Sequence, residues 1–342
     1  MSYTTINKHT DYFNTKLYTG NGTDATSITG VGFQPDWVWI KDRDSTGYHN
    51  VFDAVRGATK RIHTNTNGSE NTTAESLQSF NSDGFTVGTN SEVNTNNDNI
   101  VAWNWKANGS GSANTDGSIN STVSVNQTAG FSIVKWTGTG ANATIGHGLG
   151  AVPKMIICKS MNSGEWGTYH VSTGATKYLY LNATQAKLSA TAVWNDTAPT
   201  SSVFSVGTSG ASNESGEMIA YCFSDVRGYQ KIGNYCGQTT GENPFVHLGF
   251  KPQFILIKNQ DSGTSWCMFD TKRQPGNDDT AQVLHPNLSN AEDTGNFFFD
   301  ILSNGFKVRT TSSTVNGDGN MMIYYAVGQS LVGDNNVPCT AR

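Results

Sequence analysis

The chain has 342 residues, a net charge of −5 at pH 7 and a charged fraction of only 14%. Its length allows several domains, and its aromatic content of 11% supplies material for hydrophobic cores, which excludes a fully disordered chain. Lysine and arginine form no cluster, which argues against nucleic acid or an anionic membrane as the partner. No stretch approaches the ~18 consecutive apolar residues of a membrane-spanning helix.

The first residues, 1–16, precede the patterned part of the sequence, and we expect them to form an extended arm. They have neither the basic nor the apolar region of a secretory signal peptide. The five cysteines are an odd number and lack the close spacing of a disulfide framework or a zinc site. We therefore expect synthesis in a reducing cytoplasm, although the place of action can lie elsewhere.

From Tyr18 onward, an ordered set of short patterns occurs three times. The first pattern begins with an aromatic residue, contains a glycine and a proline, and ends in an apolar run closed by lysine, at residues 18–41, 136–159 and 235–258. A Phe-x-Val pattern and a longer apolar run follow in each copy, at residues 85–87 and 100–105, 204–206 and 218–223, and 306–308 and 322–327. This order predicts three tandem repeats of about 100 residues.

Each repeat is predicted to consist of β-strands. The run from Trp37 to Lys41 is short, apolar and rich in aromatic and β-branched residues, which is typical of a central strand. Clusters such as Asn81 to Gly84 supply the turns between strands. No segment keeps the apolar spacing of an amphipathic helix over three turns. We therefore expect an all-β protein of three tandem β-sandwich repeats, similar to jelly rolls.

The same patterns set the expected domain boundaries. A segment rich in Asn, Gly and Ser follows the first repeat and is typical of a polar linker. The predicted parts are an N-terminal arm (1–16), a first β-sandwich repeat (17–107), a polar linker (108–130), a second repeat (131–232), a third repeat (233–330) and a C-terminal tail (331–342).

Several strings in the sequence resemble the repeat of tail-fibre and other virion structural proteins of marine bacteriophages. They include YFNTKLYTGNG, ITGVGFQPDWVWIK and FNSDGFTVG early in the chain, and HLGFKPQFILIKN and DILSNGFKVRTT later. The resemblance covers nearly the whole chain and brings no known binding residues with it. It implies a virion protein, such as a fibre or an adhesin that touches polysaccharide on the host surface.

Candidate catalytic residues form no recognisable constellation. Pairs of carboxylates for glycoside cleavage would be Asp42 with Asp44, Glu214 with Glu217, and Asp278 with Asp279. All of these lie in polar segments typical of solvated turns, and none recurs at one position of the repeat. No Gly-x-Ser-x-Gly elbow lies between a strand and a helix. We therefore expect no enzymatic activity, with a polysaccharide hydrolase as the alternative.

No metal or cofactor is predicted. His147 and His247 precede glycines at similar positions of the repeat, where a hydrogen bond within a loop is the expected role. The oxygen-rich loops 94–99 and 316–320 are typical of plain hairpin turns, with Ca²⁺ binding as the alternative. The glycine-rich run 138–150 precedes a predicted strand, so it lacks the helix N-terminus that would hold a phosphate.

Three tryptophans are candidate binding residues because they lie near predicted loops: Trp166, Trp194 and Trp266. Trp37, Trp39, Trp103 and Trp105 lie instead on predicted strands and are expected to be core residues. Exposed aromatic faces stack on sugar rings, and amide side chains bind sugar hydroxyls, so this combination suits glycan recognition. For each of the three tryptophans, however, burial between sheets is the interpretation that we favour.

Together these features favour a phage virion structural protein, a tail fibre or adhesin that contacts host surface polysaccharide. The alternative is a capsid decoration, head-fibre or spacer protein with a purely architectural role. We expect the N-terminal arm to bind other virion proteins and the protein to form a homotrimer, because fibres commonly trimerise. Three copies in one chain could instead form a pseudo-threefold monomer. The expected location is the virion, after synthesis in the host cytoplasm.

Overall fold

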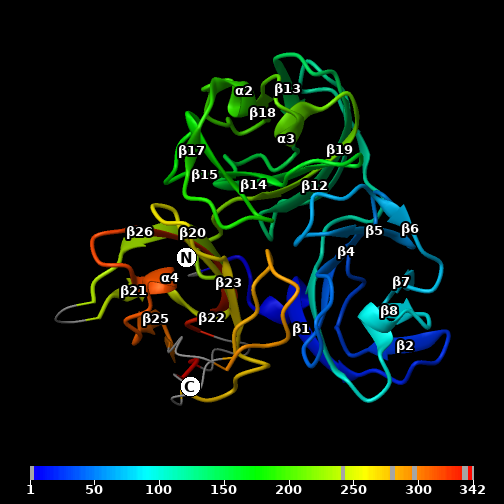
Figure 1. Ribbon diagram of the computed structural model, residues 1–342, viewed down its shortest axis with the longest axis vertical. Coiled ribbons are helices and arrows are strands. Elements are labelled where there is room, and N and C mark those ends of the chain that lie inside the picture. The colour runs from blue at the N-terminus through cyan, green and yellow to red at the C-terminus, as the bar shows by residue number, and fades with distance from the viewer. Residues whose placement is uncertain (1–3, 240–242, 278–281, 295–298, 333–337, 341–342) are drawn as a thin grey trace.

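The computed structural model describes residues 4–239, 243–277, 282–294, 299–332 and 338–340. Within these ranges the protein is all-β, as the sequence predicts, and its named strands pair antiparallel in larger and smaller sheets that pack face to face. Figure 1 shows the resulting three sandwiches around a common centre, with the first at the right, the second at the top and the third at the left. None of the described helices is long and apolar enough to cross a membrane.

The first sandwich, residues 13–105, packs a six-stranded sheet on a three-stranded sheet. In spatial order, the strands of the larger sheet are β1 (Phe13–Thr19), β9 (Asn99–Trp105), β3 (Trp37–Asp42), β4 (Asn50–Asp53), β5 (Lys60–His63) and β6 (Asn71–Thr72). The smaller sheet contains β2 (Thr26–Thr29), β8 (Gly84–Val87) and β7 (Leu77–Asn81).

The second sandwich, residues 112–223, packs an eight-stranded sheet on a two-stranded sheet. The larger sheet contains β10 (Ser112–Asn114), β11 (Ser121–Asn126), β12 (Phe131–Gly138), β19 (Gly216–Phe223), β14 (Met155–Ser160), β15 (Gly167–His170), β16 (Lys177–Tyr180) and β17 (Leu188–Ser189). The smaller sheet contains β13 (Ala143–Gly146) and β18 (Val203–Val206).

The third sandwich, residues 230–330, packs a four-stranded sheet on a three-stranded sheet. The larger sheet contains β20 (Gln230–Cys236), β26 (Met321–Ser330), β22 (Phe250–Asn259) and β23 (Cys267–Asp270). The smaller sheet contains β21 (Phe245–His247), β25 (Gly305–Val308) and β24 (Phe299–Leu302). Short helical turns complete the described structure: η1 (His9–Asp11), α1 (Ser91–Asn94), α2 (Thr191–Trp194), α3 (Gly210–Asn213) and α4 (Ser313–Asn316).

The central strands contain long apolar runs because both faces of each larger sheet are buried. In β3, Val38 and Ile40 pack against the smaller sheet of the first sandwich, whereas Trp37 and Trp39 point to the centre of the molecule. Successive side chains of a strand point to opposite faces, so alternate residues serve the two cores. An uninterrupted apolar run is therefore what a strand with two covered faces requires.

Aromatic rings from all three sandwiches meet in one central core. The ring of Trp37 lies 4.3 Å from Trp105 of its own sandwich and 4.5 Å from Tyr221 of the second, measured between centroids. The Trp105 indole N–H donates a hydrogen bond of 2.9 Å to the Tyr325 hydroxyl of the third sandwich. Large aromatic side chains bury the most apolar area per residue, so this core joins the three sandwiches into one body.

Buried hydrogen bonds close a ring around this core. The hydroxyl of Tyr221 in the second sandwich donates to Asp53 of the first at 2.8 Å, and the indole of Trp103 in the first donates to Asp270 of the third at 3.0 Å. The ring Nε2 of His170 in the second sandwich lies 3.3 Å from the backbone oxygen of Tyr324 in the third. The three strands β4, β15 and β23 occupy equivalent places in the larger sheets, and they end at Asp53, His170 and Asp270. Each sandwich therefore uses the end of the same strand to contact a neighbouring sandwich.

The segment expected to be a polar linker, 108–130, is instead largely part of the second sandwich. It contains β10 and β11, and β11 pairs with β12 along its whole length. Val123 is buried in the core of the second sandwich, whereas the Ser and Thr side chains between the valines give the sequence its polar composition. A strand with one solvent-exposed face has polar residues at alternate positions. Its sequence therefore resembles a polar linker when the other strands of its sheet lie elsewhere in the chain.

The N-terminal arm expected at 1–16 is also not free over its described part. Thr4 is 7% exposed, Ile6 is 2% exposed and belongs to the central core, and β1 begins within the arm at Phe13. Residues 4–16 therefore pack on their own chain, because Ile6 and Phe13 supply apolar side chains that the centre buries.

Candidate functional site

An open groove of about 330 Å³ lies between β20 and β21. Figure 1 shows these two strands at one side of the third sandwich. These are edge strands of the two sheets, so the groove follows the open side of the sandwich. We call it the edge groove, and its lining residues are Lys231, Gly233, Asn234, Tyr235, Phe245, Val246, His247 and Tyr324.

Two features accompany the edge groove: β20 is an uncovered edge strand, as β1 is in the first sandwich, and residue 233 has no side chain. In the second sandwich, β11 pairs with β12 and covers the edge that corresponds to β20. Where β20 pairs with β26, Gly233 lies opposite Tyr324. The corresponding pairs in the other two sandwiches are Lys16 with Ala102 and Val134 with Ala220. A Cβ atom at position 233 would lie 2.6 Å from the Tyr324 hydroxyl oxygen, so the tyrosine takes the space that a side chain there would fill.

An aromatic side chain stands at the rim of the edge groove. Phe245 is 48% exposed, although a phenyl ring is normally buried. The exposed imidazole of His247 lies two residues further along the same strand, with ring centroids 6.4 Å apart. Exposed large aromatic surface marks binding sites, so Phe245 offers a flat apolar face to a ligand.

Polar groups lie beside this aromatic face. The Lys231 ammonium donates a hydrogen bond of 2.7 Å to the backbone oxygen of His247, which ties β20 to β21. Asn234 is exposed on the edge strand, and among the described residues the Tyr324 hydroxyl has no hydrogen-bond partner. An apolar ring face with an amide, an ammonium and a hydroxyl is suited to bind a sugar ring and its hydroxyls.

The edge groove is lined by neutral and basic side chains. None of its described lining residues carries a carboxylate, whereas most glycoside hydrolases use a pair of them. Burial raises the pKa of Tyr324 well above its usual value, with a smaller contribution from Asp225, so its hydroxyl is neutral at physiological pH.

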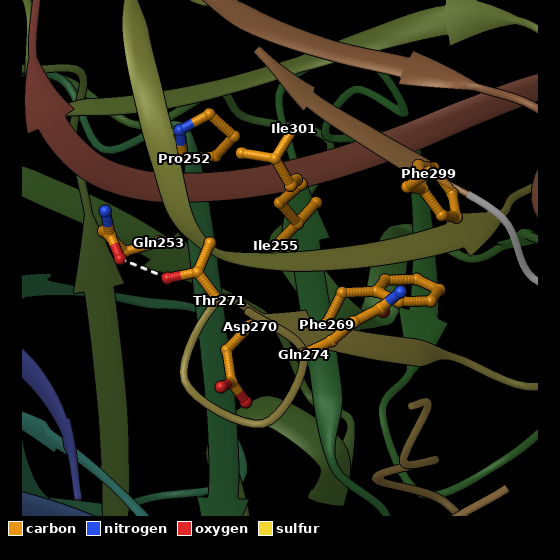
Figure 2. Close-up of a pocket in the computed structure, with 9 residues that line it drawn as sticks. All are labelled: Pro252, Gln253, Ile255, Phe269, Asp270, Thr271, Gln274, Phe299 and Ile301. Carbon is orange, nitrogen blue, oxygen red and sulfur yellow. Dashed lines mark hydrogen bonds between the residues drawn. The ribbon is translucent and has the colours of Figure 1, made fainter. Parts of the chain in front are cut away.

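A second hollow in the third sandwich is too small for an organic ligand. Figure 2 shows it between Ile255, Ile301, Phe269 and Phe299, with polar side chains at one end. Its volume is about 10 Å³, which is room for about one water molecule. This hollow is a packing defect of the apolar core and not a binding site.

The burial that we favour for Trp166, Trp194 and Trp266 agrees with the structure: each is only 1% exposed, so none of these candidate binding residues offers a face to a ligand. The Trp166 indole N–H donates 2.9 Å to the backbone oxygen of His63 in the first sandwich, and that of Trp266 donates 2.9 Å to Tyr180 in the second. Trp194 ends α2 in the core of the second sandwich. Two of these tryptophans lie in loops, as expected, but those loops are buried against the neighbouring sandwich.

The candidate catalytic carboxylates Asp42 and Glu217 have structural contacts: Asp42 stabilises a loop, and Glu217 forms an ion pair on the surface. Asp42 is 2% exposed and accepts hydrogen bonds from the backbone N–H groups of Asp44 and Ser45. Glu217 pairs with Lys135 at 2.8 Å on the surface of the second sandwich. Asp278 and Asp279 lie outside the described residues.

The predicted histidine roles divide between two environments. His147 is buried, accepts a hydrogen bond at Nδ1 from the backbone of Leu149, and its Nε2 lies 3.1 Å from the oxygen of Thr200. His147 therefore makes the expected loop contact, whereas His247 is exposed in the edge groove. Within the described ranges, no three His, Cys, Asp or Glu side chains are grouped as a metal would require.

Sequence reasoning missed a recurring buried asparagine: Asn94, Asn213 and Asn316 are all fully buried at the ends of helical turns. Each side-chain amide donates to backbone oxygens of the loop that follows β1, β12 or β20, for example from Asn213 to Ala141 at 2.6 Å. In the loops considered for Ca²⁺, Asn94 and Asn316 are thus occupied by backbone contacts. Their similar spacing, five or six residues before the last apolar run, is the signal that could have revealed them.

Sequence reasoning also used three buried lysines only as markers of the first pattern: Lys41, Lys159 and Lys258. Each ammonium donates to backbone oxygens of the loop that follows its strand, for example from Lys159 to Ser160 at 2.5 Å and to Asn162 at 2.8 Å. Burial lowers the pKa of each to about 8. Because backbone oxygens surround them, these lysines hold loops in place.

Comparison with known proteins gives one match. Residues 8–330 match the family described as "Domain of unknown function (DUF7483)", and because the match covers most of the chain, the protein belongs to that family. No curated protein and no solved structure matches.

Proposed function

We propose that this member of the DUF7483 family is a bacteriophage virion structural protein, a tail fibre or adhesin that contacts host surface polysaccharide. The resemblance of its sequence patterns to marine phage tail-fibre proteins supports the virion assignment. The edge groove, with its half-exposed Phe245, supports the contact with glycan and is the observation that carries this part of the proposal.

The interlocked architecture also suits an adhesin. In an isolated sandwich, one face of the larger sheet would be exposed. In this chain, these three faces pack together in one central core. We therefore favour a pseudo-threefold monomer over a homotrimer. Because residues 4–16 pack on their own chain, attachment to other virion proteins through a free N-terminal arm is no longer part of the proposal.

A purely architectural role is the second candidate. It is favoured by the scarcity of exposed aromatic residues, since Tyr48 and Phe245 are the aromatic side chains among the large exposed apolar residues of the described structure. In that case the protein would decorate the capsid or act as a spacer, and Phe245 would contact another virion protein.

Binding of the purified protein to an array of bacterial surface polysaccharides tests the proposal. We expect the wild-type protein to bind at least one glycan and F245A to bind it at least tenfold more weakly, since the ring face is lost. The matched control is V152A, which also removes a side chain that is 48% exposed, but in the second sandwich. Equal binding of F245A and wild type, or no binding by either, would contradict the proposal.

A further inference from the structure

The chain connects its three sandwiches in two places and leaves the third junction unconnected. One equivalent residue in each sandwich directly precedes the apolar run of the central strand: Asp36, Lys154 and Gln253. Asp36 accepts hydrogen bonds from the backbone N–H groups of Ala107 and Gly109, where the chain leaves the first sandwich. Lys154 pairs with Asp225, where the chain leaves the second. In both places a connecting segment occupies the site beside this residue.

Gln253 has no such segment beside it. Its side-chain oxygen accepts a hydrogen bond from the Thr271 hydroxyl of the same sandwich (Figure 2). Its side-chain NH₂ has no partner among the described residues. Gln253 is also the residue at which the pairing of β22 with β26 shifts register between Pro252 and Phe254. Such bulges redirect side chains and occur next to functional sites.

A pocket of about 200 Å³ lies at this third junction, between the third sandwich and the first. Gln253 and Lys272 line it from the third sandwich, and His9, Asn14 and Thr15 line it from η1 and β1. We call it the junction pocket. It corresponds to the place that a connecting segment fills at the other two junctions.

One buried polar atom in the junction pocket lacks a partner. Thr15 is 6% exposed, and its hydroxyl oxygen makes no hydrogen bond in the described structure. A buried hydroxyl without a partner costs about 1–3 kcal/mol, so it marks a place where a ligand atom would be stabilised. The hydroxyl of Thr15 and the NH₂ of Gln253 can both donate to such an atom.

The charge of the junction pocket is positive. Lys272 is exposed, no carboxylate of the described structure pairs with it, and none lines the pocket. Asp11 lies nearby but pairs with Lys8 at 3.1 Å. Burial, together with the neighbouring Lys272, lowers the pKa of His9 to about 4, so its ring is neutral at pH 7 and Lys272 is the cation that faces a ligand.

We propose that the junction pocket binds the carboxylate of an acidic sugar, with Lys272 as its cation and Gln253 and Thr15 as neutral donors. A hydrogen bond from a charged donor to a carboxylate is about twice as strong as one between neutral groups. The choice of a sugar acid rests on the proposed function, because a uronic acid unit of host polysaccharide would supply both the carboxylate and the ring that the remaining volume holds.

Titration of the full-length protein with glucuronate, glucose and acetate, followed by NMR, tests this proposal. We expect glucuronate to bind with a millimolar Kd and at least tenfold more tightly than glucose or acetate. Glucose binding as tightly as glucuronate would overturn the role of the carboxylate. Acetate binding as tightly as glucuronate would overturn the assignment to a sugar and indicate a site for simple carboxylates.

Two variants assign the binding to this pocket. K272Q should raise the Kd for glucuronate at least tenfold, and T15V about threefold, whereas K135Q on the second sandwich should leave it unchanged. T15V also removes the unpartnered hydroxyl, so it should fold at least as stably as wild type. Equal affinity of K272Q and wild type would overturn the proposal.

The same titration separates this inference from the function on which it rests. V152A, which lies outside both the edge groove and the junction pocket, should bind glucuronate as wild type does. If glucuronate does not bind while polysaccharide binding still depends on Phe245, only the junction pocket is overturned.

Discussion

Buried lysine side chains hold the loops that follow the central strands of this protein. Lys41, Lys159 and Lys258 are apolar along their stems and reach backbone oxygens with their ammonium groups, which explains how a lysine can close an apolar strand. The sequence predicts strands at these places but not the burial of the lysines, because a lysine after an apolar run usually marks the point where the strand reaches solvent.

His170 makes stability depend on pH. Burial lowers the pKa of its imidazole to about 4 in the folded protein, against 6.5 in the unfolded chain. Between these values only the unfolded chain binds the proton, so the free energy of unfolding falls as the pH drops from about 6.5 to 4 and is constant with respect to this group above about 7. The full contribution is at most about 3 kcal/mol.

Urea denaturation of H170N and wild type between pH 4.5 and 7.5 measures this contribution. Asn keeps an acceptor for the Ser172 backbone N–H, to which His170 is bonded at 3.2 Å. The difference at pH 7.5 gives the cost of the other lost contacts, and we expect it to shrink as the pH falls. A difference that is the same at every pH would contradict the assigned role of His170.

At the scale of elements, strands with two covered faces could be predicted and strands with one covered face could not. The run in β3 is apolar at nearly every position and is recognisable without a partner. In contrast, β11 (Ser121–Asn126) alternates small polar residues with valines and joins a sheet whose other strands come later in the chain. Its sequence therefore resembles that of a linker until its partner strand is known.

The contact between the first two sandwiches depends on a buried ion pair. Asp53 and Arg56 are 2.5 Å apart with side chains 0% and 1% exposed, and the same carboxylate accepts the Tyr221 hydroxyl. We expect D53N to lower the free energy of unfolding by about 3 kcal/mol, because it leaves a buried guanidinium with only Glu70 as its ionic partner.

Urea denaturation tests this contact against a surface pair. The Glu217 side chain is 50% exposed where it pairs with Lys135, so E217Q should cost less than ~1 kcal/mol. Similar losses for D53N and E217Q would show that the buried pair does not hold the first two sandwiches together.

At the scale of the whole molecule, the fold class and the recurring patterns could be read from the sequence, but the shared centre could not. An aromatic residue on a strand has the same pattern whether it packs inside its own sandwich, as Phe85 does, or between sandwiches, as Trp37 does. For the same reason, the sequence places Trp166 and Trp266 near loops but does not show that these loops pack on neighbouring sandwiches. The edge groove could not be predicted either, because it depends on which strand is left uncovered and on the packing of Tyr324 over Gly233.

The position of the protein in the particle tests the central proposal most directly. Labelling intact phage with a gold-conjugated antibody against this chain, with cryo-EM of the same particles, would give that position. We expect label at the distal end of a tail appendage, where the edge groove can reach the host surface. Label on the capsid or within the tail body would contradict an adhesin and leave Phe245 as a contact between virion proteins.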